Sequence, residues 1–82
     1  MISYLEGTII DTGERHAVIQ VGGVGYKVFV PSEILHGLQK KQGQKTSLFT
    51  YLAVRENALD LYGFGEKNEL EFFELLITIS GI

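Results

Sequence analysis

Apolar and polar side chains alternate along much of the first 64 residues, which is the period of a strand with one buried face. Residues 24–30 show the pattern most cleanly, because Val24, Tyr26, Val28 and Val30 occupy every second position. Four other segments share this period or a composition rich in strand-forming residues. We predict strands there as well, over residues 2–11, 16–21, 46–54 and 58–64.

Glycines mark the turns of this strand-rich region. Gly22 and Gly23 supply the positive φ angles that a tight hairpin demands, so the two strands flanking them should pair directly. Together with Gly25 they are interpreted as a structural hairpin. A phosphate-cradling loop is the other interpretation, but it requires a helix directly afterwards. Gly7, inside the first strand, predicts a bulge or bend.

A short helix is predicted after the third strand. Pro31 stops that strand, Ser32 is a good cap, and Gly37 ends a helix over residues 33–38. Five strands with a helix between the third and fourth is the order of an OB-fold. A small β-sandwich is the alternative, but it does not specify where the helix falls. The predicted fold is mainly β, a five-stranded OB-fold-like Greek-key barrel followed by a C-terminal helix.

The period becomes helical after Gly65. Leu70, Phe73 and Ile77 share one helical stripe. Other apolar residues widen it, namely Phe72, Leu75, Leu76 and Ile79. Such a helix carries more apolar surface than one small barrel can cover. Its uncovered side is therefore expected to meet a partner, another copy of the chain, or a downstream domain.

Composition narrows the class of protein. The 82 residues carry a net charge of −3, which argues against tight binding of DNA by this domain alone, since nucleic-acid binders usually have a basic footprint. There is no cysteine, no signal-peptide-like start, and no apolar segment of membrane-spanning length. We expect a cytoplasmic domain without disulfides or membrane association.

Few residues outside the turns are candidates for metal binding or catalysis. His16 and His36 have no acidic or histidine neighbour at ligand spacing, so surface positions are favoured over a metal site. No serine, histidine and acid have triad-like spacing. We expect no metal, no cofactor and no enzymatic activity.

Two groups of residues could contact nucleic acid. Aromatic residues could form a base-stacking platform, although packing in or around the barrel is favoured; they are Tyr4, Tyr26, Phe29, Phe49, Tyr51, Tyr62 and Phe64. Lys40, Lys41 and Lys45 could touch phosphate, but a solvated loop is the simpler interpretation.

Five segments, in order along almost the whole chain, carry a recognisable pattern. They are Met1-Ile2 through Gly7 and Ile9, Val21-Gly22-Gly23-Val24-Gly25-Tyr26, Thr50 through Val54-Arg55-Glu56, Leu61-Tyr62-Gly63-Phe64, and Phe73-Glu74-Leu75-Leu76 running into Ser80-Gly81. One short glycine-rich hairpin would be a weak signal, whereas five matches in the correct order are specific. These segments resemble the RuvA family of Holliday-junction branch-migration proteins.

The resemblance implies a modular, non-catalytic subunit that holds four-way junction DNA open for recombination and repair. Residues 1–64 would form the first domain, the core of a homotetramer. Residues 65–82 would form the leading helix and truncated hairpin of a second, helix-hairpin-helix domain that grips phosphates. A third domain would contact RuvB, an ATP-driven motor. Ser80 and Gly81 match the start of the phosphate-binding turn, and because that turn is incomplete, weak junction binding is expected of this fragment.

The family also implies an acidic pin between two strands, which matches residues 55–57. The family's tip resembles two adjacent acids, whereas this chain has Glu56-Asn57, so one carboxylate is replaced by an amide. Arg55 could neutralise Glu56 or reach a phosphate. We expect the pin to repel phosphates, more weakly than a two-acid tip. The alternative function is a stand-alone OB-fold module that binds single-stranded nucleic acid or an oligosaccharide.

Overall fold

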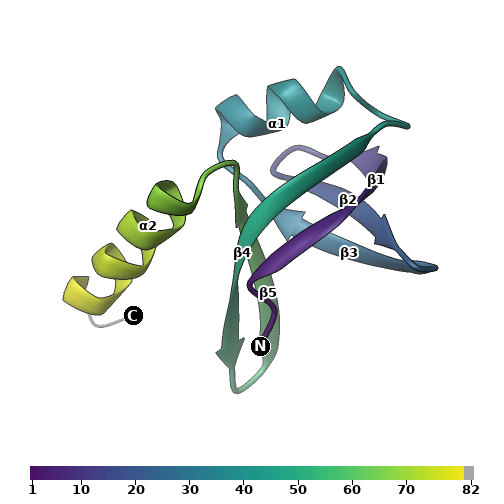
Figure 1. The fold of residues 1–82 in the computed structure, drawn as a ribbon. Helices are drawn as coiled ribbons and strands as arrows, with labels where there is room; N and C mark the ends of the chain where they lie inside the picture. Colours follow the sequence, from purple (N-terminus) through teal and green to yellow (C-terminus); the bar gives the residue numbers. More distant parts are fainter. Residues whose placement is uncertain (81–82) are drawn as a thin grey trace.

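The structure, a computed structural model, describes residues 1–80 and contains five strands and two helices (Figure 1). Their order is β1 (Tyr4–Thr12), β2 (His16–Val21), β3 (Val24–Phe29), α1 (Ser32–Gln39), β4 (Lys45–Arg55), β5 (Ala58–Phe64) and α2 (Lys67–Ser80). The strands close into a barrel in the order β1-β2-β3-β5-β4. The predicted fold class is confirmed, including the helix between the third and fourth strands.

The barrel closes because each of its five strands pairs with a neighbour on both sides. The first half of β1 pairs with β4 and the second half pairs with β2, both antiparallel. A short parallel pairing of β3 with β5, at Val28↔Leu61 and Phe29↔Tyr62, completes the ring. α1 covers one end of the barrel (Figure 1) and contributes buried Leu35 and Leu38 to the core.

Most of the alternating apolar residues point into the barrel, as their period predicts, although Val24 at the start of β3 is exposed. Ile9, Ala17, Ile19 and Val28 are completely buried. Thr50 is the buried polar side chain among the described residues, and its Oγ1 donates a 2.8 Å hydrogen bond to the carbonyl oxygen of Ile2. The core is therefore apolar with its single hydroxyl satisfied, as buried polar groups must be.

The predicted ends of α1 are wrong. The helix begins at Ser32, with Pro31 in the capping position and no side-chain capping bond, and it continues through Gly37 to Gln39. A glycine ends a helix by taking a positive φ. Gly37 does not take one, whereas Gly43, in the loop that follows, does so with φ of 89°.

The bulge predicted at Gly7 lies elsewhere. Gly7 pairs in register with Thr46, and the irregularity of β1 falls between Ile9 and Asp11. A β-carbon at Gly7 would clash with the carbonyl oxygen of Gln20 on β2. Glycine is therefore needed here for close approach of two backbones rather than for a bulge.

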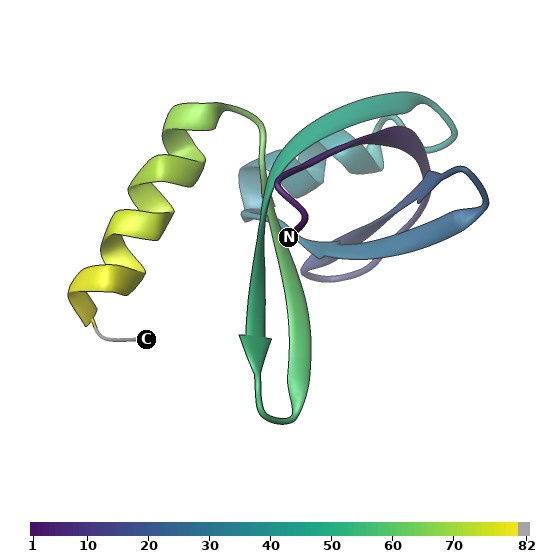
Figure 2. The same cartoon turned by 60° about the horizontal axis from the view of Figure 1, so that its bottom comes forward.

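Two features extend beyond the barrel body. Residues 53–60 of the β4–β5 hairpin pair only with each other, apart from the turn, and we call them the arm. The arm projects past the barrel, and α2 packs against the base of β4 and β5 before diverging from it (Figure 2). Leu70 of α2 is buried, whereas an apolar stripe on the helix stays exposed, as expected: Phe72, Leu75, Leu76 and Ile79. Neither described helix combines the length and apolarity needed to cross a membrane.

Candidate nucleic-acid interface

The tip of the arm is a two-residue turn, Glu56-Asn57, between the paired residues Arg55 and Ala58. Both turn residues are exposed to solvent. Within residues 1–80, the carboxylate of Glu56 takes part in no ion pair. The structure thus places a free negative charge at the end of a projecting hairpin.

Arg55 points away from the tip. Its Nη1 lies 2.8 Å from Oδ2 of Asp60, and its Nη2 donates a 3.2 Å hydrogen bond to the hydroxyl of Tyr62. The hydrogen bond with Tyr62, with a further contribution from Asp60, raises the pKa of Arg55. An arginine guanidinium is in any case charged in proteins. Arg55 therefore does not neutralise Glu56 in this structure. Its contact with a phosphate stays a prediction.

Asp60 is the residue of this site that sequence reasoning missed. A two-residue hairpin pairs Arg55 with Ala58 and therefore sets Asp60 diagonally across from Arg55 on the same face. The signal was present in the sequence, because residues 58 and 60 of a strand share a face. Predicting the contact between Asp60 and Arg55 requires the register of the hairpin, which follows from the turn length.

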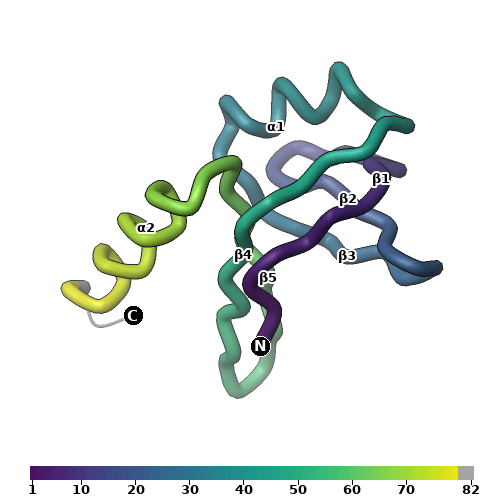
Figure 3. Tube along the Cα trace, in the orientation of Figure 1, coloured from purple at the N-terminus to yellow at the C-terminus, as the bar shows by residue number. Residues whose placement is uncertain are grey.

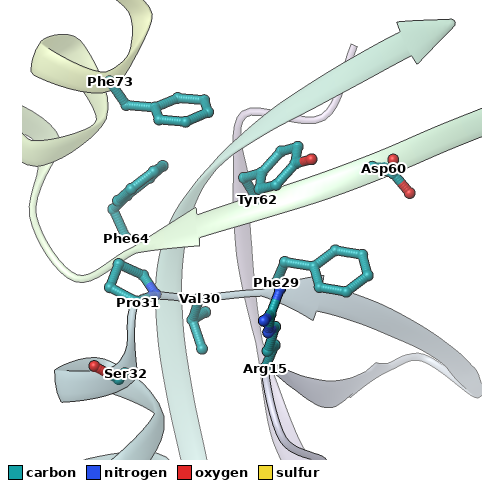
Figure 4. A pocket seen from close by; sticks show the side chains of 9 residues that line it. All are labelled: Arg15, Phe29, Val30, Pro31, Ser32, Asp60, Tyr62, Phe64 and Phe73. Carbon is teal, nitrogen blue, oxygen red and sulfur yellow. The ribbon is translucent and has the colours of Figure 1, made fainter. Parts of the chain in front are cut away.

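A row of aromatic rings joins the base of the arm to α2. The ring of Phe73 lies 5.7 Å from Tyr51, 5.5 Å from Tyr62 and 5.1 Å from Phe64, measured between centroids. Phe29 continues the row at 5.9 Å from Tyr62. Beside it lies a groove of about 610 Å³, whose lining includes the charged residues Arg15 and Asp60 (Figure 4).

The aromatic residues favour packing over a base-stacking platform. Phe64 is buried, and Tyr26, Phe29, Phe49, Tyr51 and Tyr62 are half-buried. Tyr4, the exposed member of the set, lies against Phe49 at a centroid distance of 5.3 Å. Most of these rings lie outside the barrel core but contact one another, so few ring faces are free for a base.

The basic loop and the acidic tip lie at opposite ends of β4, as the path of the chain in Figure 3 shows. Lys40, Lys41 and Lys45 are all exposed. The loop is held to β1 by hydrogen bonds from Gly43 N–H to the Ile9 carbonyl (2.7 Å) and from Ile9 N–H to the Gln44 carbonyl (2.9 Å). The three lysines and the carboxylate of Glu56 are thus separated along the molecule.

The remaining candidate residues lie apart from the arm. Gly22 and Gly23 form the β2–β3 turn with φ of 56° and 85°, as a type I′ turn requires, and Gly25 lies within β3 opposite Gln20. In the described chain, His16 and His36 join no cluster of three potential metal ligands. Ser80 is the last residue of α2. Gly81 lies outside the described residues, so the phosphate-binding turn predicted there is untested.

Comparison with known proteins places this domain in a family. The RuvA N-terminal domain family matches residues 1–63. Proteins named Holliday junction branch migration complex subunit RuvA are 48% identical in Halothermothrix orenii, 45% in Caldanaerobacter subterraneus and 40% in Brevibacillus brevis, each over all 82 residues. The chain spans 41%, 43% and 39% of these relatives, about two fifths of their length. The ordered motifs, the closed barrel and this similarity lead to one conclusion: the chain belongs to the RuvA N-terminal domain family.

Proposed function

We propose that this chain is the amino-terminal part of a non-catalytic DNA-junction subunit that acts in branch migration during recombination and DNA repair. Its family and the names of its relatives support the junction as the substrate. The observation that carries the proposed role is the free carboxylate of Glu56 at the tip of the projecting arm. A carboxylate in that position repels the phosphates of a DNA strand.

The repulsion is modest for one pair of charges and grows with the number of charges. Two unit charges 10 Å apart in water interact by about 0.4 kcal/mol, and a less polar junction centre raises this several-fold. We propose that four chains assemble as a homotetramer, so that four tips face the strands at the junction centre. The tips steer strands apart and do not capture them.

Holding the DNA falls to other parts of the protein. With a net charge of −3, the 82 residues lack the overall positive charge that supplies affinity for phosphate. We propose that residues 65–82 begin a second, helix-hairpin-helix domain, which covers the exposed stripe of α2 and grips phosphates from the turn beginning at Ser80. A further domain binds a RuvB-like ATPase motor. On this proposal, residues 1–82 alone bind junction DNA weakly.

The tetramer is tested by the molar mass in solution of a chimera. In this chimera the chain replaces the matching segment of the Halothermothrix orenii relative, whose other regions stay intact. Light scattering at micromolar concentration should give the mass of four subunits. A monomer under these conditions would contradict the proposed assembly.

The pin is tested by Glu56→Gln in the same chimera. A synthetic four-way junction carries 2-aminopurine at its centre, because this base fluoresces more strongly when unstacked. The variant should bind the junction as tightly as the parent or slightly more tightly, with reduced fluorescence at the centre. The control is Glu14→Gln, which removes an exposed carboxylate outside the arm, in the connection between β1 and β2. Markedly weaker junction binding by Glu56→Gln would refute the steering role.

A further inference from the structure

We propose that Asp60 is a positioning residue for the tip: it holds the guanidinium of Arg55 back on the arm and so keeps Glu56 as an uncompensated negative charge. The inference rests on the proposed function, since it concerns the same arm. It assigns a role to a residue that contacts neither the turn nor, in this scheme, the DNA.

The register of the hairpin sets up this contact. Arg55 pairs with Ala58, whose small side chain leaves the long arginine room to lie along the strand. Asp60 and Tyr62 follow at alternate positions of β5, on the face that Arg55 shares. Figure 4 shows both side chains on this strand.

Two bonds from two nitrogens fix the guanidinium. Nη1 pairs with Asp60 at 2.8 Å, and Nη2 donates to the Tyr62 hydroxyl at 3.2 Å. A single exposed ion pair holds a long side chain loosely. Here the side chain of Asp60 is only 27% exposed, and the second bond restricts the remaining rotation of Arg55.

Without Asp60, the negative charge at the tip would no longer be kept apart from Arg55. The arm carries one positive charge, on Arg55, and two negative charges, on Glu56 and Asp60. A released Arg55, one residue from Glu56, could neutralise it or extend past the turn. Arginine is also a preferred ligand for phosphate because its planar fork matches the phosphate oxygens. A repelling tip would therefore become a neutral or phosphate-binding one.

The test is a double-mutant cycle in the chimera, with Asp60→Asn, Arg55→Gln and the double variant. Asp60→Asn should lower the 2-aminopurine signal and tighten junction binding. The slope of log K against log salt should steepen by about 0.9 for each phosphate that a released Arg55 contacts. Tyr62→Phe, which removes only the second bond, should shift the same readouts by less.

The Arg55→Gln background separates two explanations. If Asp60 acts by restraining Arg55, then adding Asp60→Asn to Arg55→Gln should produce little further change in fluorescence and no steeper salt slope. An Asp60→Asn effect of equal size in both backgrounds would mean that Asp60 acts through its own charge, and it would overturn the inference. An unchanged salt slope and fluorescence for Asp60→Asn alone would also overturn it.

Failure of this inference is distinguishable from failure of the proposed function. If Glu56→Gln leaves strand separation unchanged, the pin itself is refuted. If Glu56→Gln lowers strand separation but Asp60→Asn does not, the pin stands and only the role of Asp60 is refuted. Melting curves of all variants should be superimposable, because both members of the ion pair lie outside the core.

Discussion

Strands β4 and β5 run through both the barrel body and the arm, yet they bury apolar side chains in the body and expose them in the arm. In the body, Leu48, Thr50 and Leu61 are at most 6% exposed, because β4 and β5 also pair with β1 and β3 there. In the arm, Val54 and Leu59 are 67% and 68% exposed, since these strands pair only with each other. Packing restricts which side chains the body can carry, whereas the exposed positions of the arm are not restricted in this way. Its sequence is therefore free to serve an interaction with another molecule.

The largest expected effect contrasts two leucines of β5. Leu61→Ala removes a buried side chain and should lower the free energy of unfolding by about 2–5 kcal/mol. Leu59→Ala, two residues away on the arm, should change it by less than about 0.5 kcal/mol. Urea unfolding of both variants measures the difference. Comparable losses would mean that the arm is part of the folding core.

A second prediction adds an atom to the body. A β-carbon at Gly63 would lie 2.6 Å from Cγ1 of Val28 and 3.2 Å from Cδ1 of Leu48. Gly63→Ala should therefore destabilise the barrel by about 1–3 kcal/mol through overpacking. The matched control is Gly37→Ala in α1, where nothing lies within 4 Å and alanine should stabilise by about 0.5–1 kcal/mol. Thermal or urea unfolding that ranks the two variants in the opposite order would show that β3 and β5 are not packed as described.

A third, smaller effect concerns the buried hydroxyl of β4. Thr50→Val removes the hydrogen bond to the Ile2 carbonyl and should lower the free energy of unfolding by about 1 kcal/mol. Thr50→Ser keeps the hydroxyl and loses only a methyl group, so it reports the packing contribution separately. Equal stability of wild type and Thr50→Val would show that the first residues are not anchored through this bond.

The smallest effect is expected on the arm itself. Asp60→Asn breaks an ion pair that lies outside the core and remains accessible to water, and such pairs contribute little to stability. The urea midpoint should stay within experimental error of wild type, and the same holds for Arg55→Gln. A clear destabilisation by either variant would mean that the ion pair supports the fold and would remove the contrast between arm and body.

Local features of the fold could be predicted from sequence, whereas contacts between distant segments could not. The alternation at residues 24–30 and the Gly22-Gly23 turn identify β2 and β3, because both signals are local. Gly7 resembles a bulge in sequence, and its role depends on where β2 passes. Gly37 resembles a helix end, but the helix continues to Gln39, so that α1 brings Leu38 into the core.

The candidate site likewise contains residues that the sequence identifies and a contact that only the structure reveals. Glu56 and Asn57 are found from the turn position and the family resemblance, and the structure places both in solvent. The restraint on Arg55 was missed, since it depends on a diagonal contact across the hairpin that only the register reveals. A charged residue next to the tip in sequence is thus directed away from it in space.

The central claim, that the tip acts by repulsion, is tested most directly by reversing its charge. Glu56→Lys in the chimera is compared with wild type and Glu56→Gln for binding to the 2-aminopurine junction. Repulsion predicts an ordered series, in which junction affinity rises and fluorescence at the centre falls from Glu to Gln to Lys. Weaker binding by the lysine variant than by wild type, or fluorescence that does not depend on the charge at residue 56, would contradict the account.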